Sequence, residues 1–491
     1  MRTVTGPSIL AHLPVRRGHS DPLHKQIYDG MRRAILDGLL RPGQRIPSTR
    51  ALAQDLAVSR LSVLTAFDQL RHEGYLVGRT GAGTFVSDAL PDDRLQVSAR
   101  LRSPPARVKA PSPTVAIAGD PWVMRPFRIN VPALDKFPHS AWARIVARRA
   151  HAIKPRQLGY THPAGLLELR EAVAEHLRTA RAVRCEAAQV LIVSGSQLAL
   201  QLCARVLLGR GDLLAIEEPG YPGAHSAFKT AGVDLAPVRV DDEGIDVAAL
   251  DAVGRRVRAV YVTPSHQYPL GTSMSAARRM ELLDWAEKRD AWLIEDDYDS
   301  EFRYVSRPLG SLQGMSAGDR VVYIGTFSKV LFPALRVGYI VVPPAQWDSF
   351  IDARDAIDIC SPTLLQLALA DFIDEGHFAR HIRRMRLIYE QRRDALLEGL
   401  ATHCDGRLTV HNADAGLQIA AFLPPGVSDT GVLAGMEKHS LMATRLSTSY
   451  LGPKRRQGLL LGFGGWDERR ITAASKALGE VLESVLSNRR R

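Results

Sequence analysis

The residue with the most evident chemistry in this chain is a lysine that follows an apolar run. Residues 322–329 read Val-Tyr-Ile-Gly-Thr-Phe-Ser-Lys, so a strand delivers Lys329 onto a loop that carries Thr326 and Ser328. A lysine held in this way can form a Schiff base with a carbonyl cofactor. Arg336 follows seven residues later and, with the two hydroxyls, could bind a phosphate ester. The segment predicts a pyridoxal 5′-phosphate site, and the alternative is a surface turn with a solvated lysine.

A second strand that ends in carboxylates favours the cofactor site. Residues 291–299 read Ala-Trp-Leu-Ile-Glu-Asp-Asp-Tyr-Asp, and Asp296 precedes Lys329 by 33 residues. A pyridoxal cofactor needs a carboxylate at its pyridine nitrogen, because the protonated ring is the electron sink of its chemistry. We predict Asp296 for that role. Tyr298 would lie on the same side of the extended strand end and could hydrogen-bond the cofactor's phenolic oxygen.

Two further segments predict contacts to the same cofactor. Residues 190–200 read as a strand, a turn of small residues and a helix start, which leaves backbone N–H groups free to bind an anion. Ser196 and Gln197 are the predicted phosphate contacts there. Residues 217–223, Glu-Glu-Pro-Gly-Tyr-Pro-Gly, place Tyr221 on a rigid turn, where its ring could stack on the pyridine plane.

These segments, in this order, resemble fold-type I aminotransferases over residues 126–491. The resemblance implies an α/β large domain with a mixed, mostly parallel sheet and a smaller C-terminal α/β subdomain. The segment Gly-Tyr-Thr-His-Pro-Ala-Gly at residues 159–165 is similar to an early motif of these enzymes. The resemblance implies that Tyr160 in this motif contacts the phosphate bound by the partner subunit of a dimer.

One position departs from the aminotransferase pattern. Transaminases usually carry Asn-Pro-Thr-Gly where this chain has Tyr-Pro-Leu-Gly at residues 268–271, so the asparagine that holds the phenolic oxygen is missing. His266, Gln267 and Tyr298 are the candidates to replace it. The departure argues against efficient transamination.

The first 88 residues predict a small, separate domain. Residues 22–35 carry apolar side chains at helical spacing, Ser48 can cap a second helix, and Ser59 can cap a third. Two short strands around a glycine-containing turn follow at residues 75–87. Two helices joined by a tight turn, with a basic start to the second, are typical of a helix-turn-helix. A generic three-helix domain is the alternative.

The whole N-terminal segment resembles a GntR-type winged helix, and its fusion to an aminotransferase-like domain resembles the MocR subfamily of GntR regulators. The resemblance implies a double-stranded DNA operator as partner. It implies that the hydroxyl side chains and the helix N-termini mainly contact DNA phosphates, and that Arg50 or Arg60 contacts base edges. The candidate DNA contacts are Ser48, Arg50, Ser59, Arg60 and Ser62, with Arg79 and Thr80 in the wing.

Composition agrees with this division. The 491 residues are 45% hydrophobic, which is enough for one small and one large core, and the net charge of +12 favours an anionic partner. Residues 1–88 carry 12 Lys and Arg against 7 Asp and Glu. The four cysteines are scattered, which predicts reduced thiols and neither disulfides nor a metal site. The sequence shows neither a signal peptide nor a membrane-spanning run, so we expect a cytoplasmic protein.

Residues 89–125 predict a basic, proline-rich linker between a winged-helix domain, residues 1–88, and an aminotransferase-like domain, residues 126–491. The linker could span two subunits, and the alternative is a solvated tether. The resemblance further implies a homodimer in which each winged helix rests on the partner's large domain.

Three functions remain open at this stage. The first is a regulator that senses pyridoxal phosphate, an amine or an amino acid. The second is a working aminotransferase with a DNA-binding appendage, and the third is a DNA-binding scaffold whose cofactor site is vestigial. Arg445 is the candidate for binding an effector carboxylate, with a surface arginine as the alternative. Relatives that respond to γ-aminobutyrate carry an arginine where this chain has Gly223, so that effector is disfavoured.

Overall fold

The computed structural model describes residues 13, 15–18, 21–90, 124–253, 256–305, 310–316, 319–404, 406–453 and 455–489. The chain forms two compact units that divide after Ser112. Most of the predicted linker, residues 91–123, lies outside the described residues, and the exact domain boundaries stay a prediction. Each unit is described by itself below.

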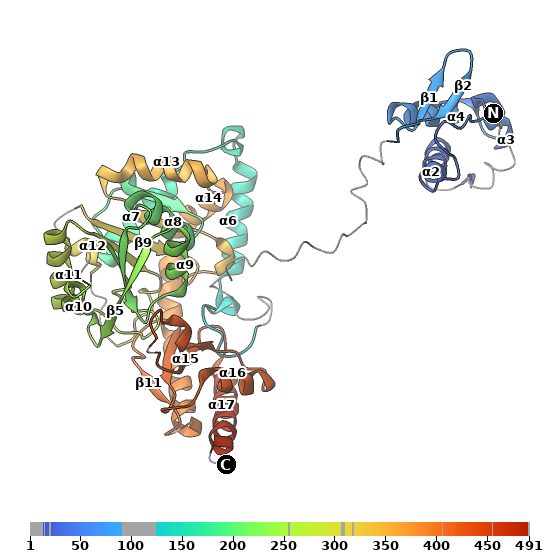
Figure 1. Ribbon diagram of the computed structural model, residues 1–491. Coiled ribbons are helices and arrows are strands. Elements are labelled where there is room, and N and C mark those ends of the chain that lie inside the picture. Colours follow the sequence, from blue (N-terminus) through green and yellow to red (C-terminus); the bar gives the residue numbers. More distant parts are fainter. Residues whose placement is uncertain are drawn as a thin grey trace. The chain divides into compact units, whose positions relative to one another are not determined.

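In its described residues, the N-terminal unit consists of three helices and a hairpin (Figure 1). Its elements are α2 (Leu23–Leu36), α3 (Thr49–Asp55), α4 (Arg60–His72), β1 (Leu76–Arg79) and β2 (Gly83–Val86). The side chains of Ser48 and Ser59 each accept a hydrogen bond of 3.2 Å, from the backbone N–H groups of Ala51 and Ser62. Both predicted helix caps are therefore confirmed, and they fix where α3 and α4 begin.

One face of α4 holds this unit together. The buried residues of α4 are Val63, Ala66, Phe67 and Leu70, and they pack against the buried face of α2. The strands β1 and β2 pair antiparallel, with Leu76 opposite Val86. The amphipathic pattern thus places the core of the unit on one side of α4 and leaves the first turn of the helix exposed.

The second unit is built on an eight-stranded sheet. In spatial order its strands are β3 (Val190–Val193), β10 (Gly338–Val341), β9 (Val321–Thr326), β8 (Trp292–Asp297), β7 (Val257–Val262), β4 (Leu213–Glu218), β5 (Asp234–Asp241) and β6 (Gly244–Ile245). Neighbours from β9 to β5 run parallel, whereas β10 runs antiparallel to both β3 and β9. The predicted mixed, mostly parallel sheet is confirmed.

Helices cover both faces of this sheet (Figure 1). One face packs on α8 (Ser196–Leu207), α9 (Pro222–Thr230) and α13 (Trp347–Asp358). The other face packs on α7 (Leu167–Arg181), α10 (Val247–Asp251), α11 (Ala276–Arg289), α12 (Leu312–Met315) and α14 (Thr363–Asp374). Alternate residues of each strand face opposite layers, as strand geometry requires: Leu191 packs in the first layer and Ile192 in the second.

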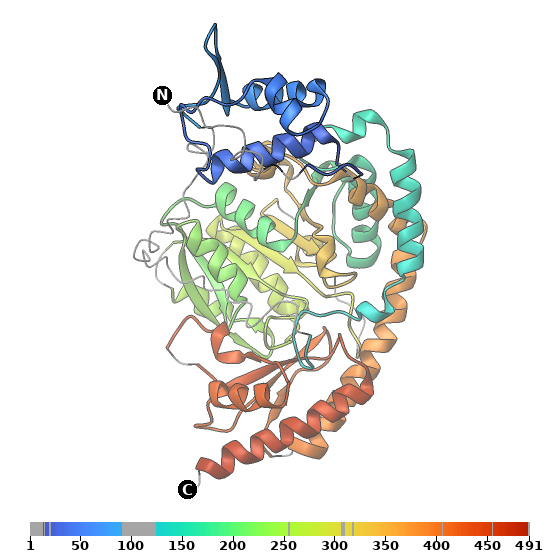
Figure 2. The ribbon, with the colours of Figure 1, turned by 90° about the vertical axis from the view of Figure 1, so that its right-hand side faces the viewer.

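A smaller subdomain follows at the C-terminal end. Its sheet has the order β11 (Thr409–His411), β12 (Gln418–Phe422), β14 (Gly458–Gly462) and β13 (Thr444–Arg445). It packs with α15 (His377–Cys404), α16 (Asp429–Lys438) and α17 (Glu468–Arg489), and α15 and α17 lie side by side (Figure 2). The long helix α6 (His139–Ala152) packs against α14. The predicted smaller α/β subdomain is thus present.

The sheet directions decide where a ligand can bind. The strands β3, β4, β7, β8 and β9 all point the same way, so their carboxyl ends and the loops that follow lie along one edge. In open α/β sheets this edge is where ligands bind.

Candidate functional site

The carboxyl edge of the sheet brings together residues that are far apart in the sequence. Each of five strands delivers one part of the predicted site at its end. These parts are Ser196 and Gln197 after β3, Tyr221 after β4, His266 and Gln267 after β7, Asp296 and Tyr298 at the end of β8, and Thr326, Ser328 and Lys329 at the end of β9.

Asp296 is a buried carboxyl with one unused oxygen. Its side chain is 3% exposed, and Oδ2 accepts a hydrogen bond of 2.7 Å from the hydroxyl of Tyr261. Oδ1 has no hydrogen-bond partner among the described residues. Burial raises the pKa of Asp296 to about 7. A buried oxygen without a partner is costly, and a protonated ring nitrogen of pyridoxal phosphate would supply both the donor and the positive charge.

Lys329 lies in the same region with a perturbed amine. It follows β9 and is half-buried. Burial lowers its pKa to about 8, against the opposite effect of the carboxylates of Asp299 and Asp296, and the cation of Arg336 lowers the pKa further. A lysine with a pKa near 8 is partly neutral at physiological pH, which is the form that attacks an aldehyde.

The turn between β3 and α8 forms a cradle for an anion beside Arg336. Gly195, the N-cap of α8, has a φ of +108° and carries no side chain to cap the first N–H groups of the helix. A Cβ atom at this position would lie 3.3 Å from two guanidinium nitrogens of Arg336. Arg336 is exposed, and no ion pair of its guanidinium is found in the described part of the chain. Helix N–H groups and a free guanidinium fit the phosphate of pyridoxal phosphate.

The predicted stacking residue is held over the edge by its neighbours. The hydroxyl of Tyr221 accepts a hydrogen bond of 3.2 Å from Nε2 of Gln197. A Cβ atom at Gly223 would lie 2.4 Å from the ring carbon Cζ of Tyr221 and from Nε2 of Gln197. A side chain at position 223 would therefore require the ring of Tyr221 and the amide of Gln197 to shift. The structure gives Gln197 a contact with Tyr221, and its predicted phosphate contact stays a prediction.

Tyrosine rings occupy the place of the missing asparagine. Tyr268 is 6% exposed, and its ring makes edge contacts with Tyr221 at 5.3 Å and Tyr298 at 6.2 Å between centroids. Of the three candidates to replace the asparagine, His266 bonds to the hydroxyl of Tyr298 at 3.0 Å. Gln267 instead donates to the carbonyl groups of Pro219 and Tyr268.

The remaining cofactor residues have different surroundings. Thr326 is buried and its hydroxyl accepts a hydrogen bond of 3.2 Å from the backbone N–H of Ser328. Tyr160 is 84% exposed, so the described residues of its own unit leave most of its side chain uncovered. Arg445 lies in β13, where Nη1 donates to Thr430 at 3.1 Å. Among the described residues, no contact joins Arg445 to the neighbourhood of Lys329.

The predicted DNA contacts gather at the start of α3 and α4 and on the hairpin. Arg50 and Arg60 are exposed in the first turns of these helices. Ser59 bonds to the Ser62 hydroxyl at 2.9 Å. Thr80 lies at the exposed tip of the hairpin.

Two observations add to the sequence prediction for this unit. Arg79 forms an ion pair of 3.2 Å with Asp88 and lies over the ring of Phe85 at 4.7 Å, so a contact to DNA must compete with both. Leu61, which the sequence reasoning missed, is 71% exposed in the first turn of α4. The sequence could have indicated Leu61, because it is an apolar residue that lies outside the buried positions 63, 67 and 70 of the same helix.

Comparison with known proteins identifies both units. Residues 126–442 match the family of class I and II aminotransferases, and residues 23–86 match the gntR family of bacterial regulatory proteins. The probable rhizopine catabolism regulatory protein MocR of Rhizobium meliloti is 38% identical over 477 residues, which are 95% of this chain and 95% of that protein. The chain belongs to the MocR subfamily of GntR regulators. A second member, the pyridoxine biosynthesis regulator PdxR of Corynebacterium glutamicum, is 33% identical and covers 97% of this chain and 99% of its own.

Solved structures agree for the second unit. The α-aminoadipate aminotransferase LysN of Thermus thermophilus, solved with N-(5′-phosphopyridoxyl)-L-leucine, is 29% identical with a TM-score of 0.69. The match covers 74% of this chain and 92% of that one. This MocR-type regulator therefore joins a DNA-binding winged helix to an aminotransferase-like domain whose cofactor is pyridoxal 5′-phosphate. None of the described helices is long and apolar enough to cross a membrane.

A substitution at Lys329 tests the cofactor attachment. The purified protein is expected to show a visible absorption band that Lys329→Ala abolishes, because the amine that binds the aldehyde is lost. Borohydride reduction of the wild type is expected to trap the cofactor on the peptide that contains Lys329. The matched control is Lys229→Ala, an exposed lysine of α9, which is expected to keep the band. A band that survives in Lys329→Ala contradicts the assignment.

Proposed function

We propose that this MocR-type regulator controls transcription by sensing an amine, an amino acid or pyridoxal phosphate itself at Lys329. The observation that supports it best is a buried carboxyl and a lysine suited to the cofactor next to an altered position 268. Asp296 keeps an unused buried oxygen, Lys329 keeps a lowered pKa of about 8, and Tyr268 replaces the asparagine of transaminases. The site can bind an amine, while the means for rapid turnover are reduced.

Each residue of the site has a proposed task toward the cofactor. When bound, pyridoxal phosphate supplies an aldehyde that reacts with amines and a ring that accepts electron density. Lys329 would bind the aldehyde carbon, and Asp296 would keep the ring nitrogen protonated. The phosphate would be bound by Arg336, Ser196, Gln197, Thr326 and Ser328, and Tyr221 would cover the ring. A ligand that frees the amine of Lys329 would change the charge beside Asp296 and Asp299. We propose that the protein senses this change of charge.

We propose that the protein is cytoplasmic and forms a homodimer. Leu158 and Tyr160 are 72% and 84% exposed, which favours coverage by a second copy. In that dimer Tyr160 would contact the phosphate of the partner's site, and the winged helices would be exchanged between the chains. The experiment is the molar mass in solution by light scattering, and a monomer with full cofactor content would contradict the shared site.

The proposed effector is defined by its chemical class: an amine, an amino acid or pyridoxal phosphate itself. Position 223 is glycine and carries no arginine for a carboxylate, so we propose that the ligand is an amine or amino acid other than γ-aminobutyrate, or pyridoxal phosphate itself. Arg445 stays the proposed contact for an effector carboxylate, although its described bond is to Thr430.

Turnover distinguishes this proposal from a working aminotransferase. The protein would be incubated with a panel of amines, amino acids and 2-oxo acids while product and the visible band are followed. We expect a ligand-dependent change of the band and less than one product per site over the time in which transcription responds. Sustained turnover of any donor and acceptor pair would support the enzyme, and failure to bind the cofactor would support a DNA-binding scaffold.

The first DNA prediction concerns Arg60. An operator would be selected from fragmented genomic DNA with the full-length protein. Arg60→Ala is expected to weaken operator binding by roughly 1–3 kcal/mol and random DNA much less, if its guanidinium contacts a base edge. Arg33→Ala, an exposed arginine of α2, serves as the control. An equal loss on both DNAs would make Arg60 a phosphate contact, and a binding constant that ignores salt would contradict an electrostatic interface.

The second DNA prediction concerns Leu61. An exposed leucine between Arg60 and Ser62 is suited to contact a thymine methyl group in the major groove. Replacing operator thymines one at a time by uracil is expected to lower wild-type affinity about fourfold at one position, near 0.8 kcal/mol for a buried methyl group. In Leu61→Ala the affinities for the thymine and uracil operators are expected to be equal. The control is Leu39→Ala, at a leucine that is 51% exposed after α2, and it is expected to keep the difference between the two operators. The same uracil penalty in both variants would exclude Leu61.

A further inference from the structure

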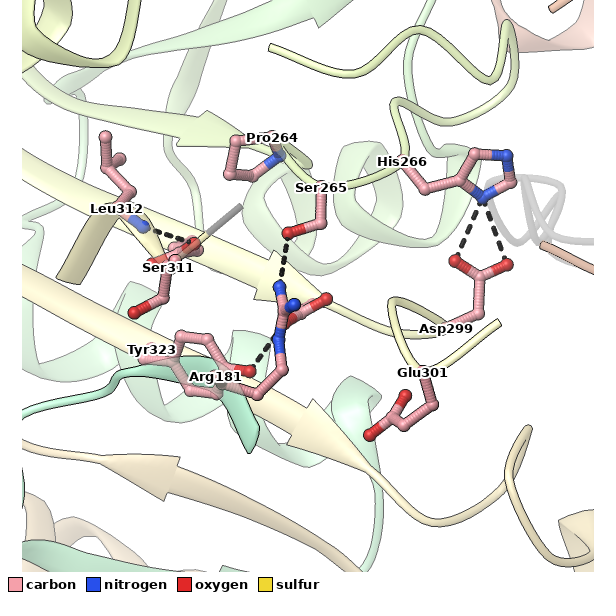
Figure 3. A network of polar contacts seen from close by, with 12 residues as sticks. Arg181, Pro264, Ser265, His266, Asp299, Glu301, Ser311, Leu312 and Tyr323 are labelled. Atoms are coloured by element: carbon pink, nitrogen blue, oxygen red, sulfur yellow. Dashed lines mark hydrogen bonds and ion pairs between the residues drawn. The ribbon is translucent and has the colours of Figure 1, made fainter. Parts of the chain in front are cut away.

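A histidine and a carboxylate form a buried pair beside Tyr298. His266 follows β7 and Asp299 follows β8, and their side chains are 3% and 2% exposed. Figure 3 shows them pointing toward one another, with Nδ1 of His266 lying 2.9 Å from Oδ1 and 3.1 Å from Oδ2 of Asp299. The same Nδ1 lies 3.0 Å from the hydroxyl of Tyr298.

The geometry determines which atoms donate. A carboxylate only accepts hydrogen bonds, so Nδ1 must carry the proton that it gives to Asp299. Nδ1 carries one proton, so the oxygen of Tyr298 can only share this N–H with Asp299 as a second acceptor and cannot donate to Nδ1. The phenolic proton of Tyr298 is therefore free for another acceptor.

The other ring nitrogen supports this tautomer. Nε2 of His266 is buried and has no hydrogen-bond partner in the described part of the chain. An N–H group left there would lose its hydrogen bond in an apolar place, whereas an unprotonated nitrogen is tolerated better. Backbone packs close to the ring: a Cβ atom at Gly416 would lie 2.1 Å from Cε1, and one at Gly271 would lie 3.3 Å from Nε2. The ring therefore has little freedom to turn.

The charges around Tyr298 keep its phenol protonated. Burial raises the pKa of Tyr298 well above its ordinary value, and Asp299, Tyr268, Asp296 and Glu217 act in the same direction. The cation of Lys329 acts on Asp296, and the cation of Arg336 in turn lowers the pKa of Lys329. Tyr298 is therefore a donor throughout the neutral range.

We propose that His266 is a positioning residue. Together with Asp299 it orients Tyr298 so that the hydroxyl of Tyr298 donates a hydrogen bond to the phenolic oxygen of pyridoxal phosphate. In this way His266 strengthens the hydrogen bonding of the same phenolic oxygen that, in transaminases, the asparagine at the position of Tyr268 contacts. The inference rests on the proposed placement of the cofactor between Asp296 and Lys329.

The test is a pH titration of the visible band of the full-length, cofactor-loaded protein. A donor to the phenolic oxygen draws negative charge from it, so loss of the donor makes the chromophore hold its proton more tightly. Tyr298→Phe is expected to raise the titration midpoint by about one pH unit, the size expected for one lost hydrogen bond. If Tyr298→Phe leaves the midpoint unchanged, the placement of the cofactor itself is wrong.

Two amide variants separate the ring nitrogens of His266. The amide nitrogen of asparagine can occupy the place of Nδ1, whereas that of glutamine reaches toward the place of Nε2. His266→Asn is expected to keep the wild-type midpoint, and His266→Gln and His266→Leu to raise it by nearly as much as Tyr298→Phe. The double variant with Tyr298→Phe is expected to add nothing to Tyr298→Phe alone, because both act through one contact.

The controls distinguish positioning from general damage. Thermal unfolding of each loaded variant shows whether it is folded, and His403→Leu, a histidine of α15, is expected to leave the midpoint unchanged. Equal shifts in His266→Asn and His266→Gln would mean that the ring acts only by packing. An unshifted His266→Gln beside a shifted Tyr298→Phe would also overturn the proposal.

Discussion

The burial of four carboxyl groups at the end of β8 is the constraint on which the site depends. Residues 295–299 contain Glu295, Asp296, Asp297 and Asp299, and all four are buried. Such groups are stable only with hydrogen bonds or opposite charge. Glu295 accepts from the backbone of α12, and Asp297 pairs with Arg181. Asp299 pairs with His266 (Figure 3). Among the described residues, one oxygen of Asp296 and one of Asp297 have no hydrogen-bond partner. Asp297 already pairs with Arg181, so Asp296 is the carboxyl for which a bound cofactor would supply the missing partner.

The same edge joins the large sheet to the C-terminal subdomain. The carboxylate of Glu218 accepts from the N–H groups of Leu451 at 2.9 Å and Gly452 at 2.7 Å. The N–H of Gly416 donates to the carbonyl of Phe302 at 2.7 Å, and Gly416 lies against His266. His266 therefore lies against a residue that also joins the subdomain to the large sheet. A change of the subdomain's position is a physical route by which the site could influence the rest of the chain.

The parts of the site that sequence could predict are those carried by short segments. The strand and loop before Lys329, the carboxylate run at Asp296 and the caps Ser48 and Ser59 need only local spacing and residue type. The pairing of His266 with Asp299 depends on two strands lying side by side, so sequence could offer His266 only as one of three candidates. The partners of Arg79 likewise come from the fold of the hairpin. The roles of the site residues toward cofactor and DNA stay predictions until they are measured.

Reciprocal binding tests the central claim, that the state of the cofactor site is coupled to DNA recognition. The affinity of the full-length protein for its operator would be measured with the cofactor removed, bound, and bound with a responding amine, and the affinity for pyridoxal phosphate with and without operator. Coupling requires the two factors to be equal, and values of about 5–150-fold are typical of allosteric proteins. We expect equal factors in this range for the wild type, and no response to the amine in Lys329→Ala. Operator affinity that is the same in all three states would contradict the account and leave a DNA-binding protein with a passive cofactor.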